Sequence, residues 1–84
     1  MRYLQVDLYD PHNIKVKRIF ARGLDASRNS TILIEETKQG YDTLYFLPEK
    51  ISFIQLLEGV IKIHYEGGHS MEIRRKDRIH FRYS

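Results

Sequence analysis

Positively charged side chains recur at alternate positions near the C-terminal end of this 84-residue sequence. Residues of equal parity lie on one face of a β-strand, so these even-numbered cations are expected to share one surface. A sheet face rich in cations is the electrostatic pattern of a surface that binds phosphate groups. Two lysines from a second basic segment are added as candidates. The predicted binding residues are Lys62, His64, Arg74, Lys76, Arg78, His80, Arg82, Lys15 and Lys17.

The charge of the chain is unevenly distributed. Residues 15–28 carry a local charge of +4 and residues 72–84 carry +3, although the whole chain carries only +3, so the other 57 positions sum to −4. Two basic segments are thus separated by an acidic middle. The same cations have two other interpretations: they keep a solvated sheet face in water, or they dock on an acidic protein surface.

Other chemistry is poorly supported by the residues present. His64, Glu72 and His80 could share a face, but their spacing matches no metal-ligand pattern and cations surround them. Glu35 and Glu36 are adjacent, so in a strand they point to opposite faces and cannot act together as acid and base. There is no cysteine, and no serine lies in a glycine-flanked nucleophile turn. We therefore predict a protein that is not an enzyme and holds no metal or cofactor.

The residues that must position such a surface favour β-strands. Isoleucine, valine, threonine, tyrosine and phenylalanine make up 26 of the 84 residues, whereas alanine occurs twice. Residues 3–9 alternate between apolar and polar side chains, which predicts a half-buried strand with Leu4, Val6 and Leu8 toward the core. Residues 10–13 then have the composition of a turn.

A second strand is predicted over residues 14–21. Ile14 and Val16 are expected to face inward, but the next apolar residues of this strand have the opposite parity. One extra residue near Lys17–Arg18 would restore the alternation, so we predict a β-bulge there.

The middle of the chain contains two short β runs, residues 31–37 and 42–47, and one ambiguous stretch, residues 49–58. Pro48 could open a helix over this stretch, and a glycine follows its end. Against a helix, the stretch is rich in isoleucine, and Glu58–Gly59 resembles a two-residue hairpin loop. A strand is favoured; a helix would make the fold α+β.

Residues 60–83 predict a hairpin, because their apolar side chains occupy odd positions on both sides of a glycine pair. Odd positions on both strands share a face only if the loop holds an odd number of residues. A three-residue loop at Gly67–His69 fits this condition. It places Ile63 opposite Ile73 and Lys62 opposite Arg74.

These elements predict one all-β domain spanning residues 1–84, an antiparallel meander that forms a curled sheet, small barrel or sandwich. So small a core is marginal, and open sheet edges favour a homodimer or higher oligomer. The predicted core consists of Leu4, Val6, Leu8, Ile32, Ile34, Ile54, Leu56, Ile61, Ile63, Ile73, Ile79 and Phe81.

Residues 51–81 resemble the later strands of cupin-type small barrels, in which an apolar strand, Glu-Gly, a β run and an Asp-containing turn recur. The His-x-His metal motif of that family is absent, and Lys76–Asp77 stands where a Gly-Asp turn is usual. The resemblance implies, at most, a metal-free half-barrel that binds a small molecule.

The function expected first is a regulatory or accessory binding module that contacts nucleic acid through the C-terminal basic face. The alternative is a structural or inhibitory homo-oligomer that docks on an acidic protein, and the half-barrel is third. The longest apolar runs are too short to cross a membrane, and the N-terminus lacks the apolar stretch of a secretory signal. An intracellular, cytoplasmic protein is therefore expected.

Overall fold

The computed structural model describes residues 2–36 and 42–77, and within them the protein is an all-β structure without helix. The predicted fold class is confirmed, and the ambiguous stretch is a strand, so the α+β alternative is wrong. The seven antiparallel strands are β1 (Arg2–Tyr9), β2 (Lys15–Ser27), β3 (Ser30–Glu36), β4 (Asp42–Leu47), β5 (Ile51–Leu57), β6 (Val60–Tyr65) and β7 (Ser70–Asp77).

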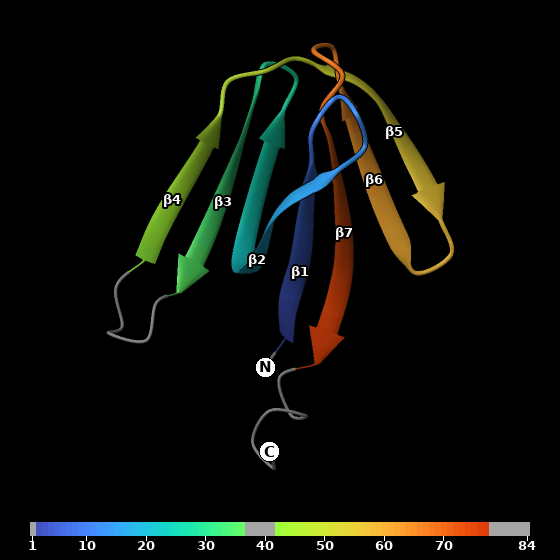
Figure 1. Cartoon of the computed structure of the whole chain (residues 1–84). Coiled ribbons are helices and arrows are strands. Elements are labelled where there is room, and N and C mark those ends of the chain that lie inside the picture. The colour runs from blue at the N-terminus through green and yellow to red at the C-terminus, as the bar shows by residue number, and fades with distance from the viewer. Residues whose placement is uncertain (1, 37–41, 78–84) are drawn as a thin grey trace.

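All seven strands belong to one sheet with the order β4-β3-β2-β1-β7-β6-β5. Two meanders, β1 to β4 and β5 to β7, are joined because the last strand pairs with the first (Figure 1). Between β4 and β5 the chain passes from one edge of the sheet to the other. The sheet is not closed into a barrel, and β4 and β5 form its two edges.

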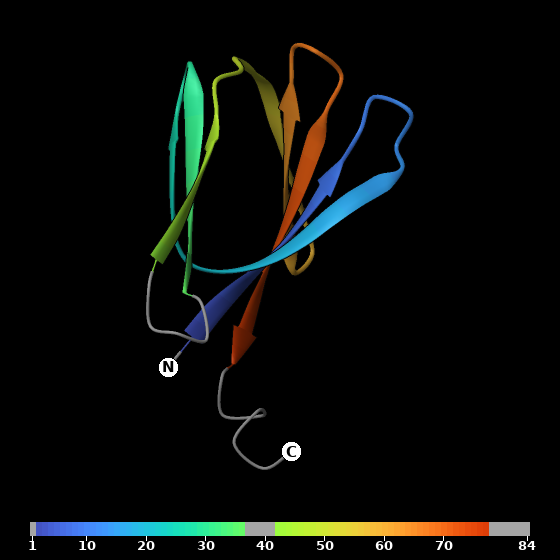
Figure 2. The ribbon, with the colours of Figure 1, turned by 60° about the vertical axis from the view of Figure 1, so that its left-hand side comes forward.

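The sheet is folded over on itself along β2. The first part of β2 pairs with β1 as far as Ala21, and the rest pairs with β3, with an irregularity between Ala21 and Gly23. This break in the ladder lets the strand turn, because a bulge increases local twist and bending. The result is two layers that open at one end (Figure 2). We call the surface between the layers the inner face and the opposite surface of the sheet the outer face.

The inner face carries the core. Val6, Ile19, Leu33 and Met71 are fully buried there and make contacts across both layers. The prediction that Leu4, Val6, Leu8, Ile63 and Ile73 belong to the core is confirmed. Three other predicted core residues, Ile54, Leu56 and Ile61, are exposed, because they lie toward the Glu58–Gly59 loop of the β5–β6 hairpin, which the second layer does not cover. Ile79 and Phe81 lie outside the described residues.

The predicted inner face of β3 is the wrong one. Leu33 and Thr31 are buried, whereas Ile32 and Ile34 are only half-buried. The irregularity in β2 explains this, since it places Leu24 opposite Leu33 on the inner face. The hydroxyl of Thr31 lies 2.7 Å from that of Tyr65, which satisfies both polar groups inside the core.

The predicted bulge at the start of β2 is present one residue earlier than expected. Leu8 pairs with Lys17 and Tyr9 pairs with Lys15, so Val16 is the extra residue. The prediction that Ile14 and Val16 face inward is wrong: these side chains are 60% and 59% exposed. The bulge also places Lys15 and Lys17 on opposite faces.

The two C-terminal hairpins differ in how well they were predicted. Leu57 pairs with Val60 across the expected two-residue Glu58–Gly59 loop, and Gly59 has a φ of 73°. The predicted register of the β6–β7 hairpin is wrong by two residues: Ile63 is opposite Met71, not Ile73, and Lys62 is opposite Glu72, not Arg74.

The loop of that hairpin consists of Glu66 to Gly68, and Tyr65 N donates to His69 O at 3.0 Å. Gly68, with a φ of 94°, occupies the last loop position, where such loops need a left-handed residue. The predicted loop would have required His69 there. Because the shift is two residues, the face on which each side chain lies is unchanged.

Candidate binding face

Four of the predicted binding residues lie together on the outer face. Lys62 in β6 and Arg74 in β7 lie on either side of Glu72, and His64 follows in β6. Lys15 joins them from β2 because of the Val16 bulge.

Among the other predicted residues, Lys17 is separate from this group. Lys17 lies on the inner face, where its Nζ is 4.7 Å from the centre of the Tyr45 ring. Lys17 therefore lies apart from Lys15 and the other three residues on the outer face. Lys76 lies opposite Tyr3 in the β1–β7 ladder. Arg78, His80 and Arg82 lie outside the described residues.

A buried carboxylate organises the group. Asp7, in the central strand β1, is 1% exposed, and Arg18 Nε donates to its Oδ1 at 2.7 Å. Two more cations approach Oδ2: Lys15 Nζ at 3.6 Å and Arg74 Nη1 at 3.4 Å. The amide of Gln5 donates to the same oxygen at 3.4 Å. Asp7 is thus held by side chains from β1, β2 and β7.

The charge state of Asp7 follows from these contacts. Burial by itself raises the pKa of Asp7, but the hydrogen bond and charge of Arg18, helped by Lys15 and Gln5, outweigh burial. The net effect is a pKa below the ordinary value of 3.8. Asp7 is therefore ionised at neutral pH, and it raises the pKa of Arg18 in return.

Glu72 links Arg74 to Lys62. Its Oε1 lies 3.0 Å from Arg74 Nη2, and its Oε2 lies 3.5 Å from Lys62 Nζ. The hydroxyl of Tyr9 donates to Glu72 Oε1 at 3.4 Å, and the ammonium of Lys62 is 5.7 Å from the Tyr9 ring centre. Burial, then the charges of Glu72 and Asp7, raise the pKa of Tyr9, which keeps its phenol neutral.

These side chains form one charged network, with four cations and two carboxylates and hence a net charge of +2. Three of the cations are substantially exposed: the side chains of Lys15, Arg18 and Arg74 are 42%, 45% and 35% exposed. The network therefore presents donors to solvent although its carboxylates are covered. Its members are Asp7, Lys15, Arg18, Lys62, Glu72 and Arg74.

Sequence reasoning missed Arg18 and the role of both carboxylates. The alternation assigns Arg18 to the outer face only if the position of the bulge in β2 is known. Asp7 has the parity of the polar face of residues 3–9, and an acid next to a basic face is the signal that could have identified it.

The outer face also carries an aromatic end, formed by Phe53 and His64. Their rings stack with centres 4.1 Å apart and an interplanar angle of 12°. His64 Nε2 lies 3.1 Å from Gln55 Oε1. Burial, and then the charge of Lys62, lower the pKa of His64 below 6.5, so the ring is neutral at neutral pH. Phe53 remains 54% exposed beside the charged network.

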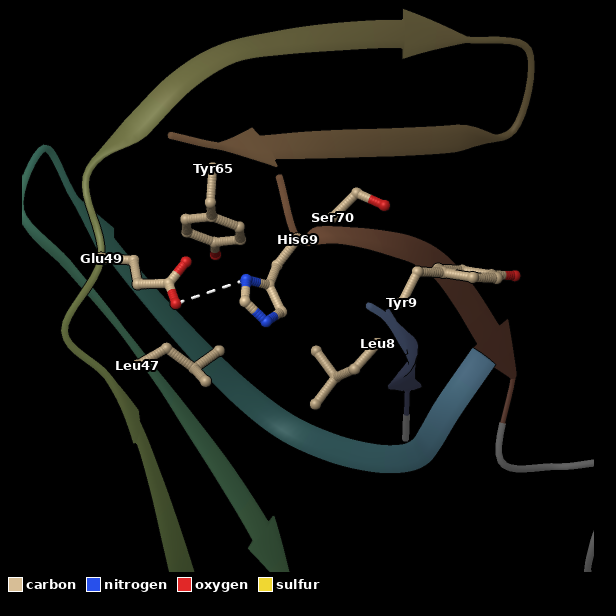
Figure 3. Close-up of a pocket in the computed structure, with 7 residues that line it drawn as sticks. All are labelled: Leu8, Tyr9, Leu47, Glu49, Tyr65, His69 and Ser70. Atoms are coloured by element: carbon tan, nitrogen blue, oxygen red, sulfur yellow. Dashed lines mark ion pairs between the residues drawn. The ribbon is translucent and has the colours of Figure 1, made fainter. Parts of the chain in front are cut away.

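A second feature lies on the inner face, at the open end of the two layers. A cavity of about 130 Å³ is lined by the apolar side chains of Leu8 and Leu47 and by the ring of Tyr65. Glu49 and His69 meet at its mouth, with Oε1 3.4 Å from Nδ1 (Figure 3). Within the part of the chain that the structure describes, no group of three metal-ligating side chains occurs here or elsewhere.

Comparison with known proteins finds no matching family model, no matching curated protein and no matching solved structure. Among residues 2–36 and 42–77 there is no helix long and apolar enough to cross a membrane. The chemistry of the outer face is therefore the basis for inferring a function.

Proposed function

We propose that the protein is a non-enzymatic binding module, a regulatory or accessory factor, that contacts single-stranded nucleic acid through its outer face. The observation that carries the proposal is the charged network, which has two more cations than carboxylates and exposes three of its four cations. A backbone of phosphates is attracted to such a surface whatever the base sequence.

The buried carboxylates support this role because they orient the guanidinium groups. A guanidinium carries five N–H donors, and Arg18 directs its Nε and Nη2 nitrogens toward Asp7. Arg74 is held between Asp7 and Glu72. Side chains fixed in this way lose less conformational entropy when a phosphate binds, because part of the ordering has taken place during folding.

Exposed aromatic rings near the network favour a single strand over a duplex. Unpaired bases stack on aromatic side chains, which contributes roughly 1–3 kcal/mol per base. Phe53 lies at one end of the cationic region, and Phe20, 41% exposed in β2, lies toward the other. A strand crossing from β5 to β2 would place phosphates over the cations and bases over these two rings.

The proposal is tested by fluorescence anisotropy with labelled single-stranded DNA and RNA. We expect Phe53→Leu to weaken binding about 5- to 150-fold, since stacking on the ring is lost. Phe46→Leu is the matched control, because Phe46 is 60% exposed but lies on β4 away from the network. Equal effects of the two variants, or no effect of either, would contradict the stacking role.

Duplex DNA and polyglutamate complete the experiment. Polyglutamate offers carboxylates without bases, so it represents an acidic protein surface. If the wild-type protein binds polyglutamate and not the single strands, the outer face is a docking surface for acidic proteins and the nucleic-acid proposal fails.

A further inference from the structure

The cavity on the inner face has an apolar interior. Its volume of about 130 Å³ is close to the roughly 150 Å³ of an apolar protein cavity that holds benzene. Leu8 in β1 and Leu47 in β4 line it from the two layers, and both side chains are only half-buried. Because these apolar groups keep exposed surface, a molecule that fills the cavity is stabilised by covering them.

The segment that carries the acidic group of the cavity is fixed in place. The two layers diverge at this end of the sheet, and the chain crosses the opening between β4 and β5 (Figure 2). Ile51 N donates to Arg28 O in the β2–β3 turn at 3.0 Å. Glu66 N donates to Lys50 O at 3.0 Å. Glu49 directly precedes these two anchored residues, so its position is defined before any ligand binds.

His69 is the partner of Glu49 at the mouth of the cavity. Its Nδ1 lies 3.4 Å from Glu49 Oε1, and the side chains of Glu49 and His69 remain 39% and 47% exposed. A carboxylate accepts hydrogen bonds, so a neutral imidazole in this position carries its proton on Nδ1 and has an acceptor at Nε2. Nε2 points into the cavity, toward Leu8 and Leu47 (Figure 3).

The polar groups that remain for a ligand at the mouth are acceptors. Among the described residues, no side chain bonds to Glu49 Oε2 or His69 Nε2, and no lysine or arginine lines the cavity. The hydroxyl of Tyr65 is occupied by its hydrogen bond inside the core. The hydroxyls of Tyr9 and Ser70 point away from the cavity (Figure 3). The complementary head group is therefore a donor.

The charge of Glu49 acts on the interior as well as on the mouth. Burial raises the pKa of Tyr65, the hydrogen bond with Thr31 opposes this, and the negative charge of Glu49 adds to the rise. The carboxylate is thus felt at the ring that lines the cavity. A negative potential attracts a cation and repels an anion.

We propose that this cavity binds a small primary amine, with the ammonium group at the mouth and an apolar body inside. An ammonium has three N–H donors, and it donates to Glu49 Oε2 and His69 Nε2. The apolar body contacts Leu8, Leu47 and the ring of Tyr65. The volume limits this body to about one six-membered ring. The site lies on the inner face and does not depend on what the outer face binds.

NMR titration of the isotope-labelled protein with benzylamine at neutral pH tests the proposal. We expect saturable shifts of the amide signals of Leu8, Leu47 and Ser70, with a dissociation constant on the order of 1 mM. Benzyl alcohol has the same ring with a neutral head and should bind roughly tenfold more weakly, because the charge-assisted contact is lost. Benzoate carries the opposite charge and should not bind.

Removing the carboxylate tests the head group. Glu49→Gln keeps the size of the side chain and should weaken benzylamine binding roughly tenfold while leaving benzyl alcohol binding nearly unchanged. Glu66→Gln is the matched control, because it removes the same charge from an exposed position of the β6–β7 loop outside the cavity. Equal losses in the two variants would mean general attraction to an acidic surface and would overturn the proposed contact.

Filling the interior tests the position of the ring. Leu47→Phe adds bulk inside the cavity and should abolish the binding of benzylamine and of benzyl alcohol. Leu44→Phe makes the same change in the same strand at a side chain that is 65% exposed, and should leave both affinities unchanged. The amide spectrum of each variant shows whether its fold is intact, and if Leu47→Phe unfolds, the Glu49→Gln comparison decides.

Two results with the wild-type protein would overturn the proposal. One is the absence of saturable shifts at about 10 mM benzylamine, a tenfold excess over the expected dissociation constant. The other is equal affinity for benzylamine, benzyl alcohol and benzoate, because the mouth would then not select a cation.

Discussion

Asp7 and Leu56 have the opposite of the solvent exposure expected for an acidic and an apolar side chain. The carboxylate is 1% exposed, and the leucine is 77% exposed, whereas acidic residues are rarely buried and leucines usually are. Asp7 lies in the central strand, where the neighbouring strands supply three cations and β1 itself supplies the amide of Gln5. Leu56 lies in an edge strand, near its loop to β6, where no second layer covers it.

The comparison teaches that burial here depends on what the neighbouring strands provide. A buried charge is tolerated where partners replace its water, and an apolar residue stays exposed where no element packs on it.

Truncation inside the core should cost far more than truncation on β5. Met71→Ala removes a fully buried side chain and should lower the free energy of unfolding by about 2–5 kcal/mol. Leu56→Ala should cost less than about 1 kcal/mol at low protein concentration. Urea unfolding of both variants provides the measurement. A large, concentration-independent loss for Leu56→Ala would show that it is covered within the monomer.

Neutralising the buried carboxylate should also destabilise the protein. Asp7→Asn leaves Lys15, Arg18 and Arg74 without their common partner, and we expect a loss of roughly 2–3 kcal/mol. This is below the loss for fully buried pairs because the cations are partly exposed. Asp25→Asn, at an exposed position of β2, is the control for urea unfolding and should change stability little. Similar losses in both variants would contradict the role of Asp7.

The contribution of Asp7 should disappear in acid. The folded pKa of Asp7 is below its ordinary value of 3.8, so the ionised carboxylate stabilises the fold above pH 3.8. This stability is lost as the pH falls from 3.8 through the folded pKa, because the unfolded chain takes up the proton first. Urea midpoints measured from about pH 5 to about pH 2 should show the gap between wild type and Asp7→Asn closing. A constant gap would contradict this account.

The smallest effect is expected at His64. Its folded pKa is below 6.5, so as the pH falls below 6.5 the unfolded chain is protonated first and stability decreases, by less than about 1 kcal/mol. His64→Gln should remove this dependence. An NMR titration of the His64 ring protons measures the pKa directly. A value above 6.5 would contradict the lowering of this pKa by burial and by the charge of Lys62.

The sequence predicts the face of a residue better than its partner or its burial. Parity placed Lys62, His64 and Arg74 on one face, and a register error of two residues left that result intact. The sequence alone could not assign Lys15 and Lys17 to opposite faces. That assignment needs the position of the bulge at Val16, and a bulge at a neighbouring residue would restore the apolar alternation equally well.

Burial was less predictable because it depends on the second layer. Ile54, Leu56 and Ile61 have the inner parity and were assigned to the core. Nothing in their alternation reveals that β3 and β4 fold over the centre of the sheet and not over its β5 edge. Long-range layer packing is set by the bend in β2, which no local pattern encodes.

The central claim is that the cations around Asp7 meet a polyanion, and the salt dependence of single-strand binding tests it most directly. Each phosphate contact releases about one counterion, so Lys15→Gln should reduce the slope of log affinity against log salt by about one. Lys17→Gln removes the same charge two residues away on the inner face and should leave the slope unchanged. Equal slopes for the two variants would contradict the account, because the anion would then be insensitive to which face carries the charge.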